Sequence, residues 1–74
     1  REYLPALTNL GYCYTYGIGV ERDYDKALEC FRKAAEQGYP RAQFQLGEAY
    51  RRGFGVEEDD GEAVKWYQSA AWLG

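Results

Sequence analysis

The sequence contains no histidine, and Ser69 is its only serine. Histidine is the commonest general base in enzymes, and a serine or cysteine nucleophile usually needs such a base beside it. Trp72 stands where a Ser-x-x-Lys arrangement would require a lysine. We therefore expect the protein not to be an enzyme and to have no catalytic residue and no cofactor.

The chain also lacks a concentration of positive charge. Nine Lys and Arg stand against twelve Asp and Glu, which gives a formal net charge of −3, and the basic residues are spread along the chain apart from short pairs such as Arg51 and Arg52. Nucleic acids and anionic membranes are bound by basic residues clustered on one face. We expect no nucleic-acid partner. The acidic run at residues 57–60 lacks the alternating ligand spacing of a calcium loop, so we expect no metal site either.

Cysteines are few, and a membrane span is not indicated. Cys13 and Cys30 lie in two different predicted helices, so a single disulfide and two packed thiols both stay open, with the thiols favoured. Residues 3–20 carry no charge, a length that can signal a membrane span, but Pro5, Asn9 and several glycines and tyrosines argue against insertion. No secretory signal is visible, and the sequence indicates no compartment. At 74 residues the chain predicts one domain with a thin core.

The sequence does contain two tandem copies of one repeat unit. Residues 10–20 and residues 46–56 share the skeleton Leu-Gly-x-x-Tyr-x-x-Gly-x-Gly-Val at a distance of 36 residues. A fixed period of this kind is typical of stacked repeat architectures. We place the first unit at about residues 3–38 and the second at about residues 39–74, within a single module of residues 1–74.

Within each unit, small and apolar residues recur with helical spacing, as they do at Ala27, Leu28, Phe31, Ala34 and Ala35. The pattern predicts helices near residues 4–16, 23–37, 40–52 and 59–73. Proline near a helix start, glycine after a helix end and aspartate as an N-cap support these boundaries. The residues concerned are Pro5, Pro40, Gly17, Gly53, Gly38, Gly74, Asp23 and Asp59, and Asp59 has capping-box spacing to Glu62.

Two glycines, Gly11 and Gly47, fall inside the predicted first helices, where glycine costs about 0.5–1 kcal/mol relative to alanine. We expect this cost to be offset by close approach of a neighbouring helix through its small residues. The wider gaps would be filled by Tyr14, Phe31, Tyr50 and Tyr67. The residues that repeat, Leu10, Gly11, Tyr14, Gly17, Gly19 and Val20 with their counterparts, are thus predicted to build the fold.

On these residues the chain resembles the Sel-1-like repeat family, a relative of the tetratricopeptide repeats. The resemblance runs from Ala6 to Gly74, and it departs from the family pattern where Cys30 and Phe31 replace the aromatic pair that Trp66 and Tyr67 retain. It implies an all-α fold, a right-handed α-solenoid of antiparallel helix pairs with four helices, which serves as a scaffold or adaptor for other proteins. About three units are normally needed for a stable solenoid, so we expect a piece of a longer array. Some cysteine-rich bacterial proteins of this type bind or hydrolyse β-lactams, which is a remote alternative.

The candidate partner-binding surface is the side of the first helices opposite the packed residues. Tyr, Phe and Arg are enriched at interface anchors, and these positions change between the two units while the skeleton does not. We predict that a protein or peptide segment binds there, with acidic character near the arginines; the plain alternative is that these residues only face water. The positions are Thr8, Tyr12, Thr15, Tyr16, Phe44, Glu48, Arg51 and Arg52.

A role of another class is also open. The two units would then be structural spacers in an array or a self-association module that uses the exposed ends of the repeat stack. Trp72 and Leu73 are the apolar residues that we expect at one such end.

Overall fold

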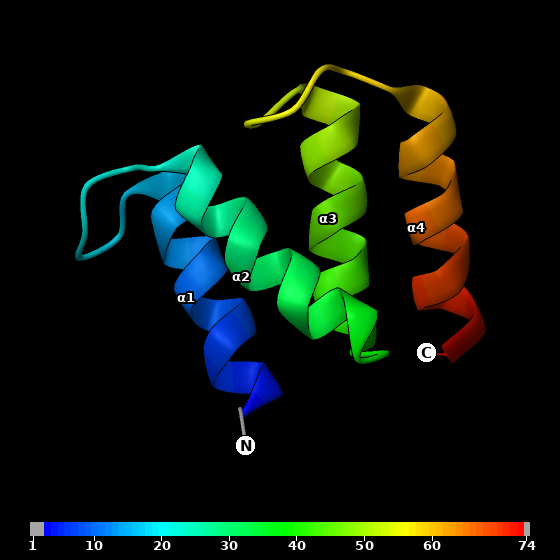
Figure 1. Cartoon of the computed structure of the whole chain (residues 1–74), viewed down its shortest axis with the longest axis horizontal. Coiled ribbons are helices and arrows are strands. Elements are labelled where there is room, and N and C mark those ends of the chain that lie inside the picture. The colour runs from blue at the N-terminus through cyan, green and yellow to red at the C-terminus, as the bar shows by residue number, and fades with distance from the viewer. Residues whose placement is uncertain (1–2, 74) are drawn as a thin grey trace.

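A computed structural model describes residues 3–73, and these form four α-helices and no strand. The helices α1 (Leu4–Tyr16), α2 (Tyr24–Glu36), α3 (Pro40–Arg52) and α4 (Asp60–Leu73) alternate in direction and make two antiparallel pairs (Figure 1). The predicted all-α class is confirmed, and the predicted helix boundaries are met to within one residue.

The first helix of each pair has a proline in its first turn and a glycine as its C-cap. Pro5 and Pro40 lie at the start of α1 and α3, where their missing N–H groups would have no helical partner. Gly17 and Gly53 close these helices with φ angles of 67° and 72°, the left-handed conformation that glycine adopts readily. These parts of the sequence interpretation are confirmed, while Gly74 lies outside the described residues.

An aspartate caps the start of the second helix of each pair. Asp23 Oδ1 accepts a hydrogen bond from the Lys26 amide at 3.2 Å, and Asp59 Oδ1 accepts one from the Glu62 amide at 3.1 Å. The backbone amides of both aspartates donate to a carbonyl of the preceding helix, on Tyr14 and Tyr50, each at 2.8 Å. In the predicted capping box the Asp59 amide would donate to the Glu62 side chain, but in the structure it donates to Tyr50, which ties the loop to α3.

Removal of one cap is expected to have a measurable cost. Asp23→Ala should lower the free energy of unfolding by about 0.5–2 kcal/mol, because the Lys26 amide loses its acceptor. Asp23→Asn keeps an acceptor oxygen and is the matched control. Urea denaturation followed by circular dichroism measures both; an alanine variant as stable as the asparagine variant would contradict the cap.

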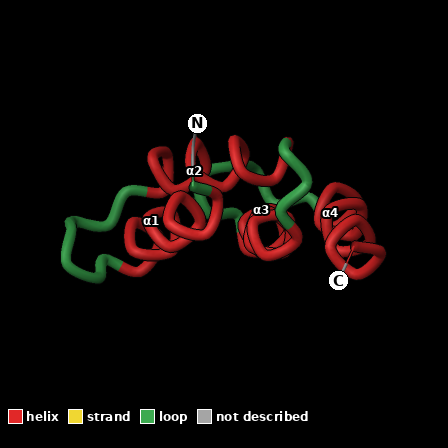
Figure 2. The backbone as a smooth tube through the Cα atoms, turned by 90° about the horizontal axis from the view of Figure 1, so that it is seen from below, coloured by secondary structure: helices red, strands yellow, loops and turns green. Residues whose placement is uncertain are grey.

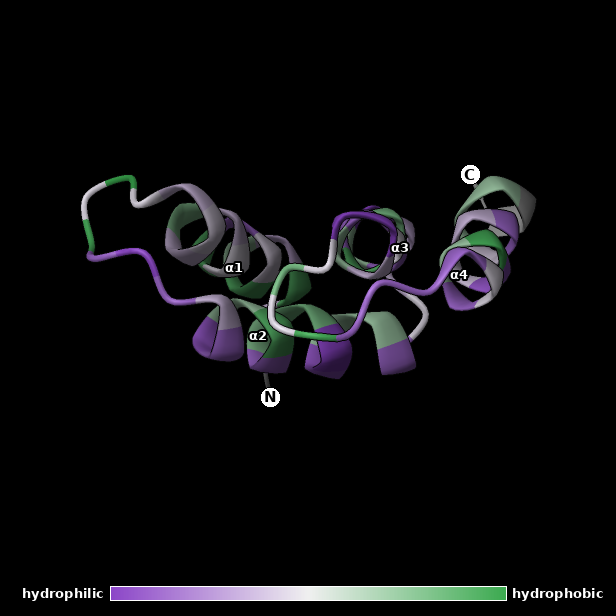
Figure 3. Ribbon diagram, turned by 90° about the horizontal axis from the view of Figure 1, so that it is seen from above, coloured by the Kyte–Doolittle hydropathy of each residue, from purple (hydrophilic) through white to green (hydrophobic). Residues whose placement is uncertain are grey.

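The helices form a thin slab with principal extents of 31 × 29 × 15 Å. α2 packs against both α1 and α3, and α4 packs against α3. α1 and α3 lie next to each other on one side of α2 (Figure 2). Figure 3 shows the apolar side of α2 turned toward them and its polar side turned away. The buried core is correspondingly small and consists of Ala27, Leu28, Phe31, Ala34, Ala35, Ala42, Leu46 and Ala49.

The two glycines inside α1 and α3 each lie under an aromatic ring. A Cβ atom on Gly11 would come within 2.7 Å of the Phe31 ring, and one on Gly47 within 2.9 Å of the Tyr67 ring and 3.2 Å of the Ala63 carbonyl oxygen. The close approach that we predicted is present. Its partners were predicted only in part, because an aromatic ring lies closest to each glycine, while one of the expected small residues, Ala63, contacts Gly47.

The two cysteines are free thiols. Cys30 is buried, and burial is the main cause that raises the pKa of its thiol. A thiol with a raised pKa stays protonated near neutral pH and is a poor nucleophile.

Two residues of the repeated skeleton do not pack as predicted. Leu10 is 42% exposed, whereas its repeat equivalent Leu46 is 0% exposed, and Val20 is 38% exposed, whereas Val56 packs against the core. α2 covers the second unit on this side. Among residues 3–73, no helix covers the corresponding side of α1.

Candidate partner-binding groove

A groove of about 420 Å³ runs between α1 and α3. We call it the α1–α3 groove. Its lining combines aromatic, amide and cationic side chains from both helices. These are Thr8, Asn9, Tyr12, Arg41, Phe44 and Gln45.

Two of the predicted binding residues, Thr8 and Thr15, are buried, so their prediction as surface anchors was wrong. Thr8 is 2% exposed and Thr15 is 6% exposed. Their hydroxyl groups donate to the carbonyls of Leu4 and Gly11, four residues earlier, at 2.8 and 2.9 Å. A threonine hydroxyl can form its hydrogen bond within its own helix. Both threonines can therefore be buried on the packed side of α1 without leaving a polar group unpaired. Thr8 therefore forms the floor of the groove.

The tyrosines predicted beside them are accessible. Tyr12 and Tyr16 are 43% and 47% exposed, and their ring centroids lie 4.8 Å apart. Tyr12 lines the groove. Tyr16 borders a second hollow of about 10 Å³, which has room for about one water molecule. Gln45 lines both hollows.

Phe44 forms the opposite wall of the groove, and α4 supports it from behind. Phe44 is 45% exposed, and its ring centroid lies 5.4 Å from that of Tyr67. The Tyr67 hydroxyl is buried, and burial followed by the Glu48 carboxylate raises the pKa of this phenol. The packing of the Tyr67 ring against Phe44 means that α4 contributes to the groove without lining it.

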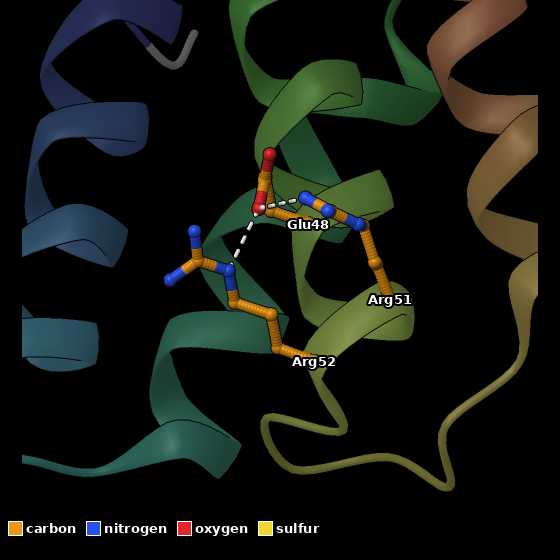
Figure 4. A network of polar contacts seen from close by, with 3 residues as sticks. All are labelled: Glu48, Arg51 and Arg52. Atoms are coloured by element: carbon orange, nitrogen blue, oxygen red, sulfur yellow. Dashed lines mark ion pairs between the residues drawn. The ribbon is translucent and has the colours of Figure 1, made fainter.

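The predicted charged residues of α3 form a network of their own (Figure 4). Glu48 Oε1 lies 3.0 Å from Arg52 Nε and 4.0 Å from Arg51 Nη1. The Arg52 guanidinium also lies 5.9 Å from the Phe54 ring centroid. Three residues that share one net positive charge attract an acidic partner less than two free arginines would. Neither arginine lines the groove.

Sequence reasoning missed three lining residues, Asn9, Arg41 and Gln45. Asn9 and Gln45 are exactly one repeat apart, so the chain places a carboxamide at the same position of both units. A search for chemically similar pairs, rather than for positions that change, would have found them. Arg41 is exposed at the groove, and the structure records no ion pair for it within residues 3–73.

Within residues 3–73, no group of three or more histidine, cysteine, aspartate or glutamate side chains could hold a metal ion. No helix in this range is long and apolar enough to cross a membrane.

The chain is similar in sequence and in structure to known repeat proteins. The family model described as Sel1 repeat matches residues 4–39 and 40–74. The structure of a Sel1 repeat protein from Oxalobacter formigenes is similar, with 44% identity and a TM-score of 0.90 over 95% of this chain and 28% of that one. The protective antigen c5321 of uropathogenic Escherichia coli, which displays an SLR fold, shows 46% identity and a TM-score of 0.92 over 97% of this chain and 15% of that one. This chain therefore spans less than a third of either protein, and it belongs to the Sel1 repeat family.

Proposed function

We propose that the α1–α3 groove binds an extended segment of a partner protein and that the chain acts as a non-catalytic scaffold. The observation that carries this proposal is the pair of repeat-equivalent carboxamides, Asn9 and Gln45, in one groove with two exposed aromatic rings. Membership of the Sel1 repeat family supports it, because such repeats generally serve as scaffolds for contacts between proteins.

The carboxamides suit a polypeptide backbone as ligand. Each side-chain amide of Asn9 and Gln45 offers both donors and an acceptor, as a peptide group does. An extended segment carries N–H and C=O groups that must find partners when they leave water. Two amides on neighbouring helices can therefore hold the segment along the groove without regard to its side chains.

The other lining residues define what the segment should carry. An apolar or aromatic side chain fits between Tyr12 and Phe44, where ring contacts contribute beyond the area that they bury. A carboxylate fits next to Arg41, whose guanidinium can form a charge-assisted hydrogen bond. The acidic position expected near Arg51 and Arg52 moves to Arg41 in this proposal, because Glu48 already pairs with those two arginines.

A random peptide library displayed on phage tests the proposal directly. Peptides selected on the wild-type chain should be synthesised, and their affinities measured by fluorescence anisotropy. Asn9→Trp, which fills the groove from an exposed position, and Arg41→Glu, which reverses its charge, should each weaken binding at least about tenfold. The melting temperature should stay nearly unchanged, because both side chains are exposed.

Arg32→Glu is the matched control. It makes the same charge reversal at an exposed position of α2 that does not line the groove, and it should leave peptide affinity unchanged. Selected peptides that bind the two groove variants as tightly as the wild type would refute the proposal. Equal weakening by Arg41→Glu and Arg32→Glu, with no effect of Asn9→Trp, would show that binding depends on net charge alone.

A further inference from the structure

The α1–α3 groove is short and lies between the two units. The side chains of Trp72 and Leu73, which we expected at an end of the repeat stack, lie outside the described residues. On α3 the groove is lined by Arg41, Phe44 and Gln45. An α-helix rises about 1.5 Å per residue, so along the helix axis Arg41 lies about 4.5 Å from Phe44 and about 6 Å from Gln45. The groove therefore spans about one helical turn of α3.

The charge of the groove comes from one residue. Arg41 alone is charged among the described residues that line the groove, and it is exposed. Glu48, the acidic residue of α3, does not line the groove and lies 3.0 Å from Arg52 Nε. The lining thus offers a site for a carboxylate near the start of α3 and no acidic side chain for a basic residue.

The apolar position of the groove lies one turn farther along α3. Phe44 and Tyr12 are 45% and 43% exposed, and both line the groove. The Tyr67 ring packs behind Phe44 with centroids 5.4 Å apart, and it lies close on Gly47, where a Cβ would approach it to 2.9 Å. Tyr67 therefore limits how far Phe44 can turn away, and the fold sets the distance between Arg41 and the apolar position.

The two carboxamides of the groove favour an extended ligand. Asn9 and Gln45 each carry both donors and an acceptor, which can bind the N–H and C=O groups of a peptide unit. An α-helix has already paired these groups within itself, whereas an extended segment has them free. We therefore compare the groove with the spacing of side chains along an extended chain.

An extended segment rises about 3.3 Å per residue, and successive side chains point to opposite faces. Side chains two residues apart lie on the same face at a distance of about 6.6 Å, which is close to the spacing of the cationic and apolar positions of the groove. Separations of one or three residues place the two side chains on opposite faces. A separation of four residues spans about 13 Å and is too long.

We infer that the groove selects an extended segment in which an acidic and an apolar side chain stand two residues apart. The carboxylate pairs with Arg41, and the apolar side chain lies between Tyr12 and Phe44. The backbone of the residue between them faces Asn9 and Gln45. This preference rests on the proposed function of the groove and adds a fixed spacing to it.

Four phage-displayed peptide libraries test the spacing. Each library fixes one aspartate and one leucine, in either order, at a separation of one, two, three or four residues, and fills the other positions with residues that are neither acidic nor apolar. Peptides selected on the wild-type chain are synthesised, and their affinities are measured by fluorescence anisotropy. The separation of two should give peptides that bind at least about tenfold more tightly than the best peptide of the other libraries.

A charge exchange tests the contact with Arg41. Arg41→Glu should weaken the best peptide at least about tenfold, and a lysine in place of the peptide's aspartate should restore most of the affinity for this variant. The lysine peptide should bind the wild type weakly. Arg32→Glu, at an exposed residue outside the groove lining, is the matched control and should not improve binding of the lysine peptide.

Equal affinities from the four libraries would overturn the inferred spacing. A preference for a separation of three or four residues would also overturn it, because it would mean that the segment binds as a helix. Improvement of the lysine peptide by Arg32→Glu as large as that by Arg41→Glu would replace the contact with an effect of net charge.

The spacing and the proposed function can fail separately. Peptides that lose affinity for Asn9→Trp but bind equally well at every separation would overturn the spacing alone. Libraries that yield no peptide sensitive to Asn9→Trp would refute the proposed function of the groove, and the spacing with it.

Discussion

Leu46→Ala is expected to lower the free energy of unfolding by about 2–5 kcal/mol, and Leu10→Ala by less than about 1 kcal/mol. The two leucines occupy the same position of their repeats, but Leu46 is 0% exposed and Leu10 is 42% exposed. Removal of a fully buried side chain leaves a cavity in the core, whereas an exposed site loses few contacts. For a domain with a core this small, the first substitution removes much of the total stability.

The comparison contains its own control, because both variants make the same chemical change in the same helical position. Urea denaturation measures both. Equal destabilisation by the two substitutions would contradict the different exposure of Leu10 and Leu46. A negligible effect of Leu46→Ala would contradict the packing of α2 on α3.

Gly47→Ala is expected to destabilise the protein by about 1–2 kcal/mol. Overpacking costs about 1–3 kcal/mol, which exceeds the gain of about 0.5–1 kcal/mol that alanine provides in a helix. The new methyl group would meet the Tyr67 ring at 2.9 Å and the Ala63 carbonyl oxygen at 3.2 Å, and the carbonyl belongs to the backbone of α4. Thermal and urea unfolding measure the loss.

The destabilisation by Gly11→Ala should depend on the Phe31 ring alone. Its three closest contacts, at 2.7 to 3.1 Å, all belong to the Phe31 ring. Phe31→Leu should therefore relieve the clash, and the double variant should be more stable than the sum of the two single changes predicts. Tyr67→Leu should not relieve Gly47→Ala to the same degree, because the Ala63 oxygen remains.

Gly61→Ala is the control for both glycines. Gly61 is exposed in the first turn of α4, and a Cβ there would meet only the Asp59 side chain, at 3.3 Å. We expect no loss at this position and a gain of up to about 1 kcal/mol from helix propensity. A destabilisation as large as that of Gly47→Ala would mean that close packing is not the reason for glycine in α3.

The helices could be predicted because their signals are local. Pro5, Gly17 and Asp23 act on the backbone within a few residues, and a second copy of the same signals 36 residues later removes ambiguity. The same repetition identified the family on the residues that build the fold. It also misled at Leu10, because identical residues suggested identical burial.

The exposure of the candidate binding residues could be predicted only in part. Tyr12, Tyr16 and Phe44 are exposed as expected, since their positions lie outside the helical spacing of the packed residues. The same helical spacing also selected Thr8 and Thr15, which are buried. Helical spacing alone does not show which side of α1 another helix covers.

By itself, the sequence determined the four helices, their ends, the repeat and the family, because turn chemistry, capping and periodicity act over short distances along the chain. Only the tertiary structure decided which members of the repeat are covered. Burial depends on the helix that packs from outside a unit: α2 covers Leu46, and no described helix covers Leu10. The tertiary structure likewise decided that Asn9, Arg41 and Gln45 meet Tyr12 and Phe44 in one groove, since that meeting requires α1 and α3 to lie side by side.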